Sequence, residues 1–159
     1  MNIDIICVGK IKEKYLQDAI AEYSKRLSKY CHLNIIELKD EKTPDGESMA
    51  LDERIKATEG ERIIRAIDEN AFVFVLDLKG SEMSSPDFSR KIDKLKINGY
   101  SKLQFIIGGS LGLSKEVIKK ADHNLKFSEM TFPHQLMRVI LLEQIYRAFR
   151  IMNNEPYHK

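Results

Sequence analysis

The fold is decided by residues 103–112, which read LQFIIGGSLG. Residues 103–107 form a short apolar run rich in branched and aromatic side chains, a pattern typical of a buried strand. Glycines follow at positions 108, 109 and 112, and glycine lets the backbone turn sharply or lets a ligand approach the main chain closely. The spacing matches neither a phosphate-binding P-loop nor the dinucleotide fingerprint. Residues 108–112 are therefore either a plain tight turn or a ligand-binding loop.

The same step from strand to helix recurs on both sides of this stretch. Short apolar runs predict further strands at 3–8, 33–38, 72–78 and 125–128. Apolar residues at steps of three and four, together with helix start and stop residues, predict helices at 13–30, 49–67, 84–98, 114–121 and 135–152. This alternation predicts an α/β protein with a mostly parallel sheet and helices on both faces, in one domain spanning residues 1–159.

Parallel sheets of this kind bind ligands at the carboxyl ends of their strands. The rule selects the loops after Leu76, after Ile107 and after Phe127. Residues 127–134, FSEMTFPH, keep no strand or helix period. They form either a packed loop or, because large apolar side chains stand beside two hydroxyls, the wall of a pocket for a flat heterocycle.

Composition excludes several classes of protein. The chain has 159 residues, 43% of them hydrophobic and 31% charged, and a formal net charge of +2. These values exclude a disordered chain and a protein that coats nucleic acid. No apolar run approaches the roughly 20 residues of a membrane span, and no signal-like start precedes the first strand. With only Cys7 and Cys31, and no metal-ligand spacing of His, Cys and acids, we expect a cytoplasmic protein with no membrane segment, disulfide framework or metal site.

Basic residues gather toward both ends of the chain. Between Lys10 and Lys29 six basic residues stand against three acids, and after His134 four stand against two. This distribution suits a phosphate-bearing partner that touches both termini, or else a solvated helix face. The charged segment 39–48 has no assigned role.

The predicted last helix carries an arginine in the middle of an apolar arc. At 100° per residue, Leu142, Ile145, Tyr146, Phe149 and Met152 fall within roughly 80° of Arg138. Apolar residues on nearly every side predict a subunit interface, or alternatively a helix buried within its own monomer. A buried Arg138 needs a partner: Glu143 of another copy, loop carbonyls or an RNA phosphate.

Taken together, these segments resemble the ribosomal RNA large subunit methyltransferase H family, which belongs to the SPOUT, or alpha/beta knot, methyltransferases. The resemblance runs over the whole chain and is most specific in the carboxyl-terminal third. The residues that carry it are Val8, Gly9, Lys10, Ile107, Gly108, Gly109, Gly112, Met130, Thr131, Phe132, Pro133, His134, Gln135, Arg138, Glu143, Gln144, Tyr146, Arg147, Ala148, Tyr157, His158 and Lys159.

The resemblance implies a SPOUT fold with a deep trefoil knot near the carboxyl terminus, a homodimer, and S-adenosylmethionine as methyl donor. It further implies methylation of N3 of a pseudouridine in 23S rRNA, with the assembled ribosome as substrate. Asn154 stands where the family is expected to have glycine, and asparagine tolerates left-handed backbone angles better than most residues. The implied cofactor-binding residues are Leu76, Gly108, Phe127, Ser128, Glu129, Met130, Thr131 and Phe132.

Methylation of an imide nitrogen requires loss of its proton, and few titratable groups lie in the matched segments. We hypothesise that His158 assists proton removal while Arg138 favours the anion or grips a phosphate, with Tyr157 as a candidate for base stacking. Two other functions fit the same residues: a nucleotide- or flavin-binding α/β protein, and a non-catalytic ribosome-binding or assembly factor.

Overall fold

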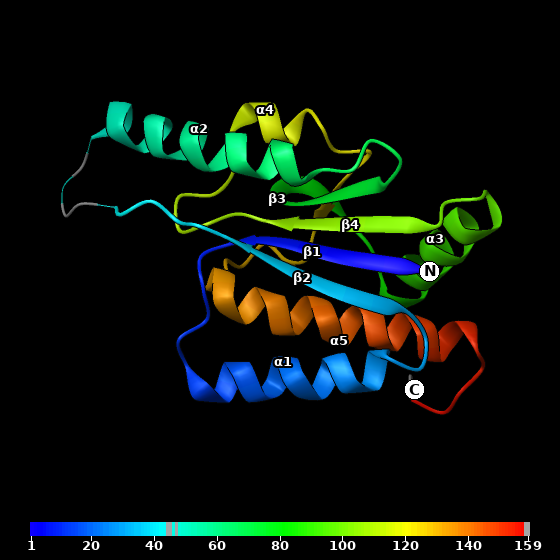
Figure 1. The fold of residues 1–159 in the computed structure, drawn as a ribbon. Helices are drawn as coiled ribbons and strands as arrows, with labels where there is room; N and C mark the ends of the chain where they lie inside the picture. The colour runs from blue at the N-terminus through cyan, green and yellow to red at the C-terminus, as the bar shows by residue number, and fades with distance from the viewer. Residues whose placement is uncertain (44–45, 47, 158–159) are drawn as a thin grey trace.

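Strands and helices alternate along the chain, as predicted (Figure 1). The computed structural model describes residues 1–43, 46 and 48–157. The elements are β1 (Asn2–Val8), α1 (Lys14–Leu27), β2 (His32–Leu38), α2 (Met49–Ala66), β3 (Phe72–Glu82), α3 (Ser85–Ile97), β4 (Lys102–Ile107), α4 (Lys115–Ile118), β5 (His123–Lys126) and α5 (His134–Met152).

One sheet joins the five strands in the order β2-β1-β4-β3-β5, and every neighbouring pair is parallel. The prediction of a mostly parallel sheet is therefore confirmed. All five strands end at the same edge, and Gly9, which follows β1, donates its backbone N–H to the carbonyl of Leu38 at the end of β2 (2.8 Å). The loops that follow the strands are thus neighbours in space although they are far apart in sequence.

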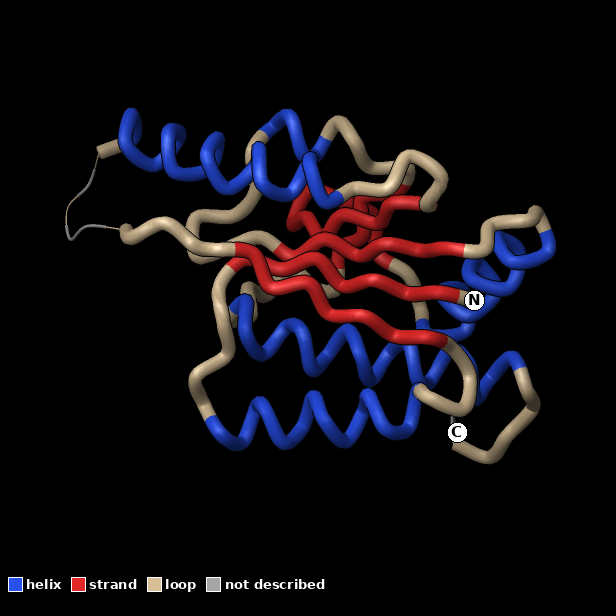
Figure 2. The backbone as a smooth tube through the Cα atoms, viewed as in Figure 1, coloured by secondary structure: helices blue, strands red, loops and turns tan. Residues whose placement is uncertain are grey.

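Helices cover both faces of the sheet, with α2 and α4 on one face and α1, α3 and α5 on the other (Figure 2). Successive residues of β1 alternate between the two cores: Ile5 packs under α1, α3 and α5, whereas Ile6 packs under α2 and α4. This period of two is the side-chain geometry of a strand that is buried on both faces.

Helix α5 lies along the sheet between α1 and α3 and begins at the edge where the strands end (Figure 1). Each of its residues is buried or half-buried. The stripe predicted around Arg138 is buried within the same chain, including Leu142, Ile145 and Phe149. Own-chain packing, the alternative to a subunit interface, therefore accounts for this stripe, and the homodimer stays a prediction.

Strand β3 differs from its prediction. It continues to Glu82, whereas the predicted strand ends at residue 78. The pairing with β5 shifts register between Leu76 and Ser81, so a bulge lets β3 resume beside Leu125. Strand β5 itself spans His123–Lys126, two residues earlier than predicted, which leaves Phe127 and Ser128 in the following loop.

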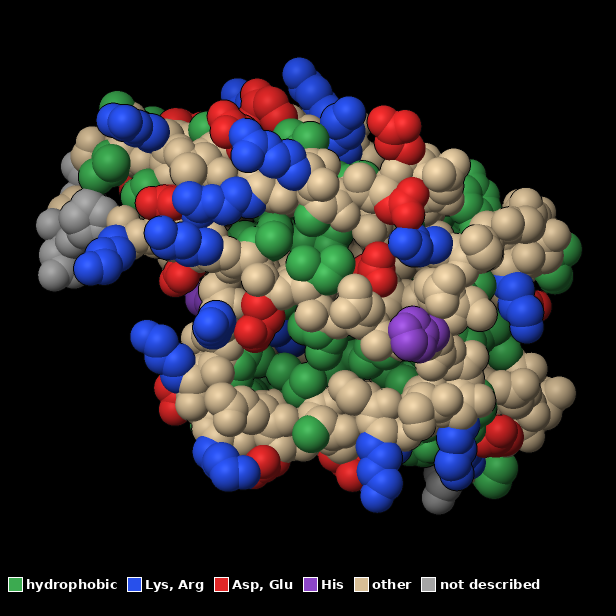
Figure 3. All heavy atoms as spheres, in the orientation of Figure 1, with side chains coloured by type: hydrophobic (Ala, Val, Ile, Leu, Met, Phe, Trp, Pro, Cys, Tyr) green, Lys and Arg blue, Asp and Glu red, His purple; other side chains and the backbone are tan. Residues whose placement is uncertain are grey.

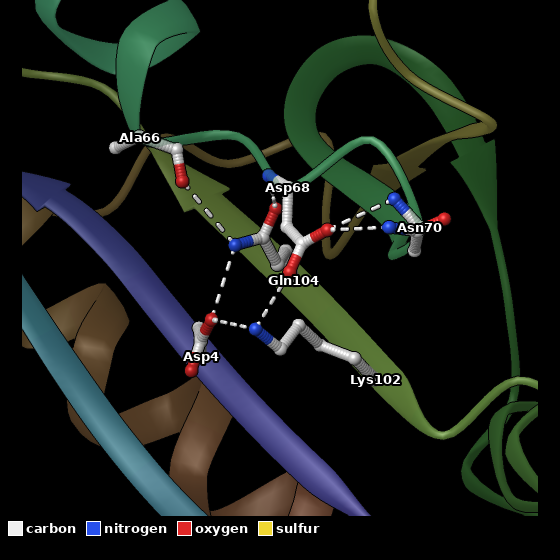
Figure 4. Close-up of polar contacts among 6 residues, drawn as sticks. All are labelled: Asp4, Ala66, Asp68, Asn70, Lys102 and Gln104. Atoms are coloured by element: carbon white, nitrogen blue, oxygen red, sulfur yellow. Dashed lines mark hydrogen bonds and ion pairs between the residues drawn. The ribbon is translucent and has the colours of Figure 1, made fainter.

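A buried polar network fixes the amino-terminal half of the sheet (Figure 4). Gln104 in β4 is 1% exposed, donates to the Asp4 carboxylate (3.0 Å) and to the Ala66 carbonyl (3.3 Å), and accepts from the Asp68 backbone N–H (2.9 Å). Lys102 adds an ion pair with Asp68 (2.8 Å). The turn from α2 into β3 is thereby anchored to β1 and β4.

Candidate functional site

A cavity of about 410 Å³ lies at the edge where the parallel strands end. The three loops selected from the sequence all contribute to its wall. Seven of the eight residues predicted for cofactor binding line it: Leu76, Gly108, Phe127, Ser128, Met130, Thr131 and Phe132. The eighth, Glu129, does not line it; its side chain is 85% exposed and pairs with Lys126.

The glycine segment is both a tight turn and a wall of this cavity. Gly112 donates its backbone N–H to the carbonyl of Gly109 (3.1 Å), and the two residues form an isolated antiparallel bridge. A Cβ on Gly108 would lie 2.9 Å from Cγ of Leu113, so no larger residue fits there without movement. The two interpretations of residues 108–112 therefore do not exclude each other.

The segment between β5 and α5 forms the facing wall. Ser128 closes a short turn by accepting a hydrogen bond from the backbone N–H of Met130 (3.0 Å). Phe127, Met130 and Phe132 bring apolar surface to the cavity, with the hydroxyl-bearing Ser128 and Thr131 beside them. This mixture of apolar walls and a few polar groups is typical of small-molecule sites.

Several lining residues were missed by sequence reasoning. Lys56 from α2 and Lys115 from α4 reach the cavity from the other layer of helices, Asp77 reaches it from the predicted part of β3, and Lys79 reaches it from the unpredicted extension of that strand. No local pattern marks the two helix lysines, because their approach depends on packing across the sheet. His134, by contrast, belongs to the segment 127–134 that the sequence offered as a possible pocket wall.

His134, the first residue of α5, lines the cavity and is half-buried. Burial lowers the pKa of its imidazole, and the positive charge of Arg138 one helical turn later lowers the pKa further, while Asp40 opposes both. The ring is therefore neutral at neutral pH and has a lone pair for accepting a hydrogen bond.

Arg138 is 1% exposed and has partners within its own chain. Its Nη2 donates to the carbonyls of Val8 and Gly9, both at 2.8 Å, and its Nη1 pairs with Glu37 at 3.0 Å. Among the partners considered from the sequence, the loop carbonyls are confirmed, whereas Glu37 was not foreseen. Arg138 thus fixes the end of β1, and its contact with an anion or an RNA phosphate stays a prediction.

Residues 153–157 turn back along α5, and Tyr157 packs beside the middle of the helix. The Tyr157 hydroxyl donates to Glu143 (3.2 Å), and the Arg147 guanidinium lies 4.7 Å from the centre of the Tyr157 ring. Asn154 has a φ of 53°, which confirms that this asparagine takes the left-handed conformation. His158 lies outside the described residues.

His134 begins α5 at the cavity, and Glu143, the partner of Tyr157, follows nine residues later. Nine helical residues span roughly 14 Å. The described part of the tail, which ends at Tyr157, is therefore held apart from the cavity of its own subunit.

Neither cysteine offers a nucleophile to this site. Both are free and buried, and burial raises the pKa of the Cys7 and Cys31 thiols to about 11. Among residues 1–43, 46 and 48–157, no group of three or more His, Cys, Asp and Glu side chains is arranged to hold a metal ion. The described helices include none with the length and hydropathy of a membrane span.

A parallel α/β sheet with a partly apolar cavity at its carboxyl edge defines a class of proteins that bind nucleotide-like ligands at the strand ends. A family model described as "Predicted SPOUT methyltransferase" matches residues 1–158. The chain belongs to the SPOUT methyltransferase family.

Curated relatives match the chain along its full length. A Clostridium kluyveri protein named "Ribosomal RNA large subunit methyltransferase H" is 61% identical over 159 residues, which is 100% of both chains. A Clostridium perfringens protein named "Ribosomal RNA large subunit methyltransferase H 1" is 62% identical, again over 100% of both chains.

Solved structures share the fold at low sequence identity. A probable methylase family protein from Haemophilus influenzae is 15% identical with a TM-score of 0.58, over 99% of this chain and 70% of that one. A Legionella pneumophila protein, solved in complex with the bound cofactor SAM, is 10% identical with a TM-score of 0.52, over 94% of this chain and 66% of that one. The expected SPOUT fold class is confirmed, and the trefoil knot stays a prediction.

Proposed function

We propose that this chain transfers a methyl group from S-adenosylmethionine to N3 of a pseudouridine in 23S rRNA, with the assembled ribosome as substrate. The observation that carries the proposal is the cavity, which gathers seven of the eight residues expected to bind the cofactor in a chain of this family. The names of the full-length relatives support the large-subunit rRNA as the substrate. Such a substrate implies a cytoplasmic location.

The cavity fits a nucleoside that carries an amino-acid tail. Its volume of about 410 Å³ falls within the roughly 300–1,000 Å³ common for small-molecule sites. We propose that Leu76, Phe127, Met130 and Phe132 bury the faces of the adenine, while backbone groups at Gly108 and along the facing wall, from Ser128 through Glu129 to Thr131, bind its edge. When bound, S-adenosylmethionine supplies an electrophilic methyl group.

The protein must also deal with the proton on the acceptor nitrogen. An imide nitrogen becomes nucleophilic once this proton is removed, and a positioned base contributes to that removal. We propose His158 as the group that assists it. Arg138, one helical turn beyond the cavity-lining His134, supplies a positive charge that favours the developing anion.

The position of the tail supports the homodimer. Tyr157, which immediately precedes His158, is held beside Glu143, roughly 14 Å along α5 from the cavity-lining His134. We therefore propose that His158 of one subunit serves the cavity of the other. Half-buried apolar residues of α5 outside the central stripe, among them Leu136 and Ile140, offer surface for such a contact.

The decisive experiment is transfer of a labelled methyl group to intact ribosomes and, in parallel, to naked rRNA. We expect incorporation into ribosomes, strongly reduced with naked rRNA, and loss of most turnover in a His158→Ala variant. Near-normal turnover of this variant would remove His158 from the chemistry. Incorporation into neither substrate would overturn the proposed function.

The same preparation separates the two other functions. Binding of flavin mononucleotide in place of S-adenosylmethionine, detected by absorbance and by thermal shift, would favour a flavin-binding protein. Binding to ribosomes without any affinity for the methyl donor would favour an assembly factor.

A further inference from the structure

Four lysines gather beside the cavity at the ends of β1 and β2. Lys10 and Lys12 follow β1, and Lys39 and Lys42 follow β2. We call these four residues the lysine cluster. All four are exposed, and within the described part of the chain none has an ion-pair partner. Figure 3 shows Lys and Arg side chains along this end of the molecule.

The backbone that carries Lys10 and Lys12 is fixed from beneath. Ile11 between them is buried, its N–H donates to Glu37 (3.4 Å), and its carbonyl accepts from Gln17 (2.8 Å). With Ile11 directed into the protein, the two flanking lysines extend into solvent. The turn therefore presents its positive charges on a rigid support.

The neighbouring loop is fixed in the same way. Arg62 from α2 donates to the carbonyl of Lys39 (2.7 Å) and pairs with the Glu41 carboxylate. The buried Glu59 accepts a hydrogen bond from the backbone N–H of Glu41 (2.9 Å). Lys39 and the described part of its loop are thus held to α2.

The acids around the lysine cluster are largely neutralised by arginines instead of by the lysines. Glu37 pairs with Arg138 and Glu41 pairs with Arg62. The lysines lie in two turns, residues 9–13 and 39–43. Among the described acids of these turns, two have no ion-pair partner: Glu13 and Asp40. Four lysines against two free acids leave a net positive surface.

Two chains of contacts connect this surface to the cavity. Arg138 binds the carbonyls of Val8 and Gly9 just before Lys10, and His134 one helical turn earlier lines the cavity. On the other side, the Thr43 hydroxyl lies 3.5 Å from that of Ser110 in the glycine segment. The lysine cluster therefore stands next to the cavity.

We propose that the lysine cluster binds phosphates of the rRNA strand that presents the target nucleotide to the cavity. This inference rests on the proposed function. Lysine is a flexible point charge, suited to phosphate contacts that position a nucleic acid without reading its sequence. Tyr15 in the first turn of α1 is 69% exposed, and exposed aromatic rings beside basic residues commonly stack on RNA bases.

The test compares two double variants that remove the same charge. Lys10→Gln with Lys12→Gln alters the lysine cluster, and Lys94→Gln with Lys96→Gln alters exposed residues in the last turn of α3, at the opposite edge of the sheet. Binding to purified ribosomes is measured by co-sedimentation over a range of salt concentrations. Thermal shift with S-adenosylmethionine verifies that each variant keeps its fold and its cavity.

We expect the Lys10/Lys12 variant to bind ribosomes roughly tenfold more weakly, and the slope of log affinity against log salt to fall by about 1 to 2. The α3 variant should match the unaltered protein. Lys10→Arg with Lys12→Arg should restore most of the affinity, because charge is the property required.

Unchanged affinity and salt dependence in the Lys10/Lys12 variant, or an equal loss in the α3 variant, would overturn the inference. These outcomes differ from failure of the proposed function. If the unaltered protein binds ribosomes but transfers no methyl group, the proposed function falls, and the binding data still decide the role of the lysine cluster. If the unaltered protein binds no ribosome, both fall.

Discussion

At the scale of single residues, Arg138 stabilises the backbone at the end of β1, next to the candidate site. An Arg138→Ala variant leaves the carbonyls of Val8 and Gly9 and the carboxylate of Glu37 without their partner. Breaking a buried ion pair costs about 3–5 kcal/mol. Because the Glu37 side chain is 35% exposed, we expect a loss near the lower end, about 3 kcal/mol in urea denaturation.

Arg65→Ala is the matched control for Arg138. Arg65 and its partner Glu61 are both largely exposed, and exposed pairs contribute about 1 kcal/mol or less. An Arg138→Ala variant as stable as Arg65→Ala would show that Arg138 does not fix the end of β1.

His134 gives the protein a dependence of stability on pH. Burial and the positive charge of Arg138 lower the pKa of its imidazole in the folded state below its ordinary value of 6.5. The unfolded chain therefore binds a proton more readily, and the free energy of unfolding falls as the pH drops from 6.5 to the folded pKa. A His134→Gln variant should lose this component, which urea denaturation from pH 5 to 8 would reveal. Parallel pH profiles for both proteins would contradict the prediction.

At the scale of elements, Gln104 couples β4 to β1 and to the turn before β3. A Gln104→Leu variant keeps a similar volume but leaves the Asp68 N–H, the Ala66 carbonyl and the Asp4 carboxylate without this partner. Each unsatisfied buried group costs about 1–3 kcal/mol, and Lys102 still lies 3.8 Å from Asp4. We expect a loss of about 2–4 kcal/mol in thermal or urea denaturation.

Asn70→Ala tests whether that loss is specific. Asn70 is exposed, and its side chain makes only a long contact of 3.5 Å with Asp68. Its removal should change stability by less than about 0.5 kcal/mol. Equal effects of the two substitutions would mean that the network in Figure 4 does not anchor the sheet.

The elements that the sequence predicted well are those set by local patterns. The helix predicted at 84–98 is α3: the Ser84 hydroxyl caps its start by accepting a hydrogen bond from the Asp87 backbone N–H, and the helix ends beside Asn98. The end of β3 was wrong because the shift between Leu76 and Ser81 depends on pairing with β5. A register set between distant strands leaves no signature in either strand alone.

The candidate site also has parts that the sequence could predict and parts that it could not. Its three loops could be predicted, because strands in a parallel sheet end at one edge whatever their order. Lys56, Lys115 and the partner of Arg138 could not be predicted, since their contacts join residues far apart in the chain; Glu37 precedes Arg138 by 101 residues. Sequence patterns locate strand ends, while side-chain partners require the folded packing.

At the scale of the whole molecule, the net charge of +2 limits how this chain can bind RNA. The composition does not provide enough excess basic residues for a uniformly basic surface. Affinity for the RNA must therefore come from local clusters of basic side chains and from the shape of the ribosome. A dimer would present two lysine clusters and two tails, which enlarges the contact area without a further domain. This arrangement predicts weak binding to free RNA.

The dimer itself can be tested by combining two damaged sites. In a Gly108→Val variant the new side chain collides with Leu113, which we expect to distort the cavity wall, whereas in His158→Ala only the tail is altered. Co-expression with two affinity tags isolates the mixed dimer. If each tail serves the partner's cavity, the intact tail of the first variant meets the intact cavity of the second, and one of two sites is restored.

We therefore expect both homodimeric variants to be nearly inactive and the mixed dimer to regain about half of the methyl transfer of the unaltered dimer, since one site in two is complete. If each tail served its own subunit, every site in the mixed dimer would carry one defect, and activity would stay at the level of the parents. That result would contradict the crossed arrangement, in which the hydrogen bond from Tyr157 to Glu143, roughly 14 Å along α5 from His134, holds the tail short of its own cavity.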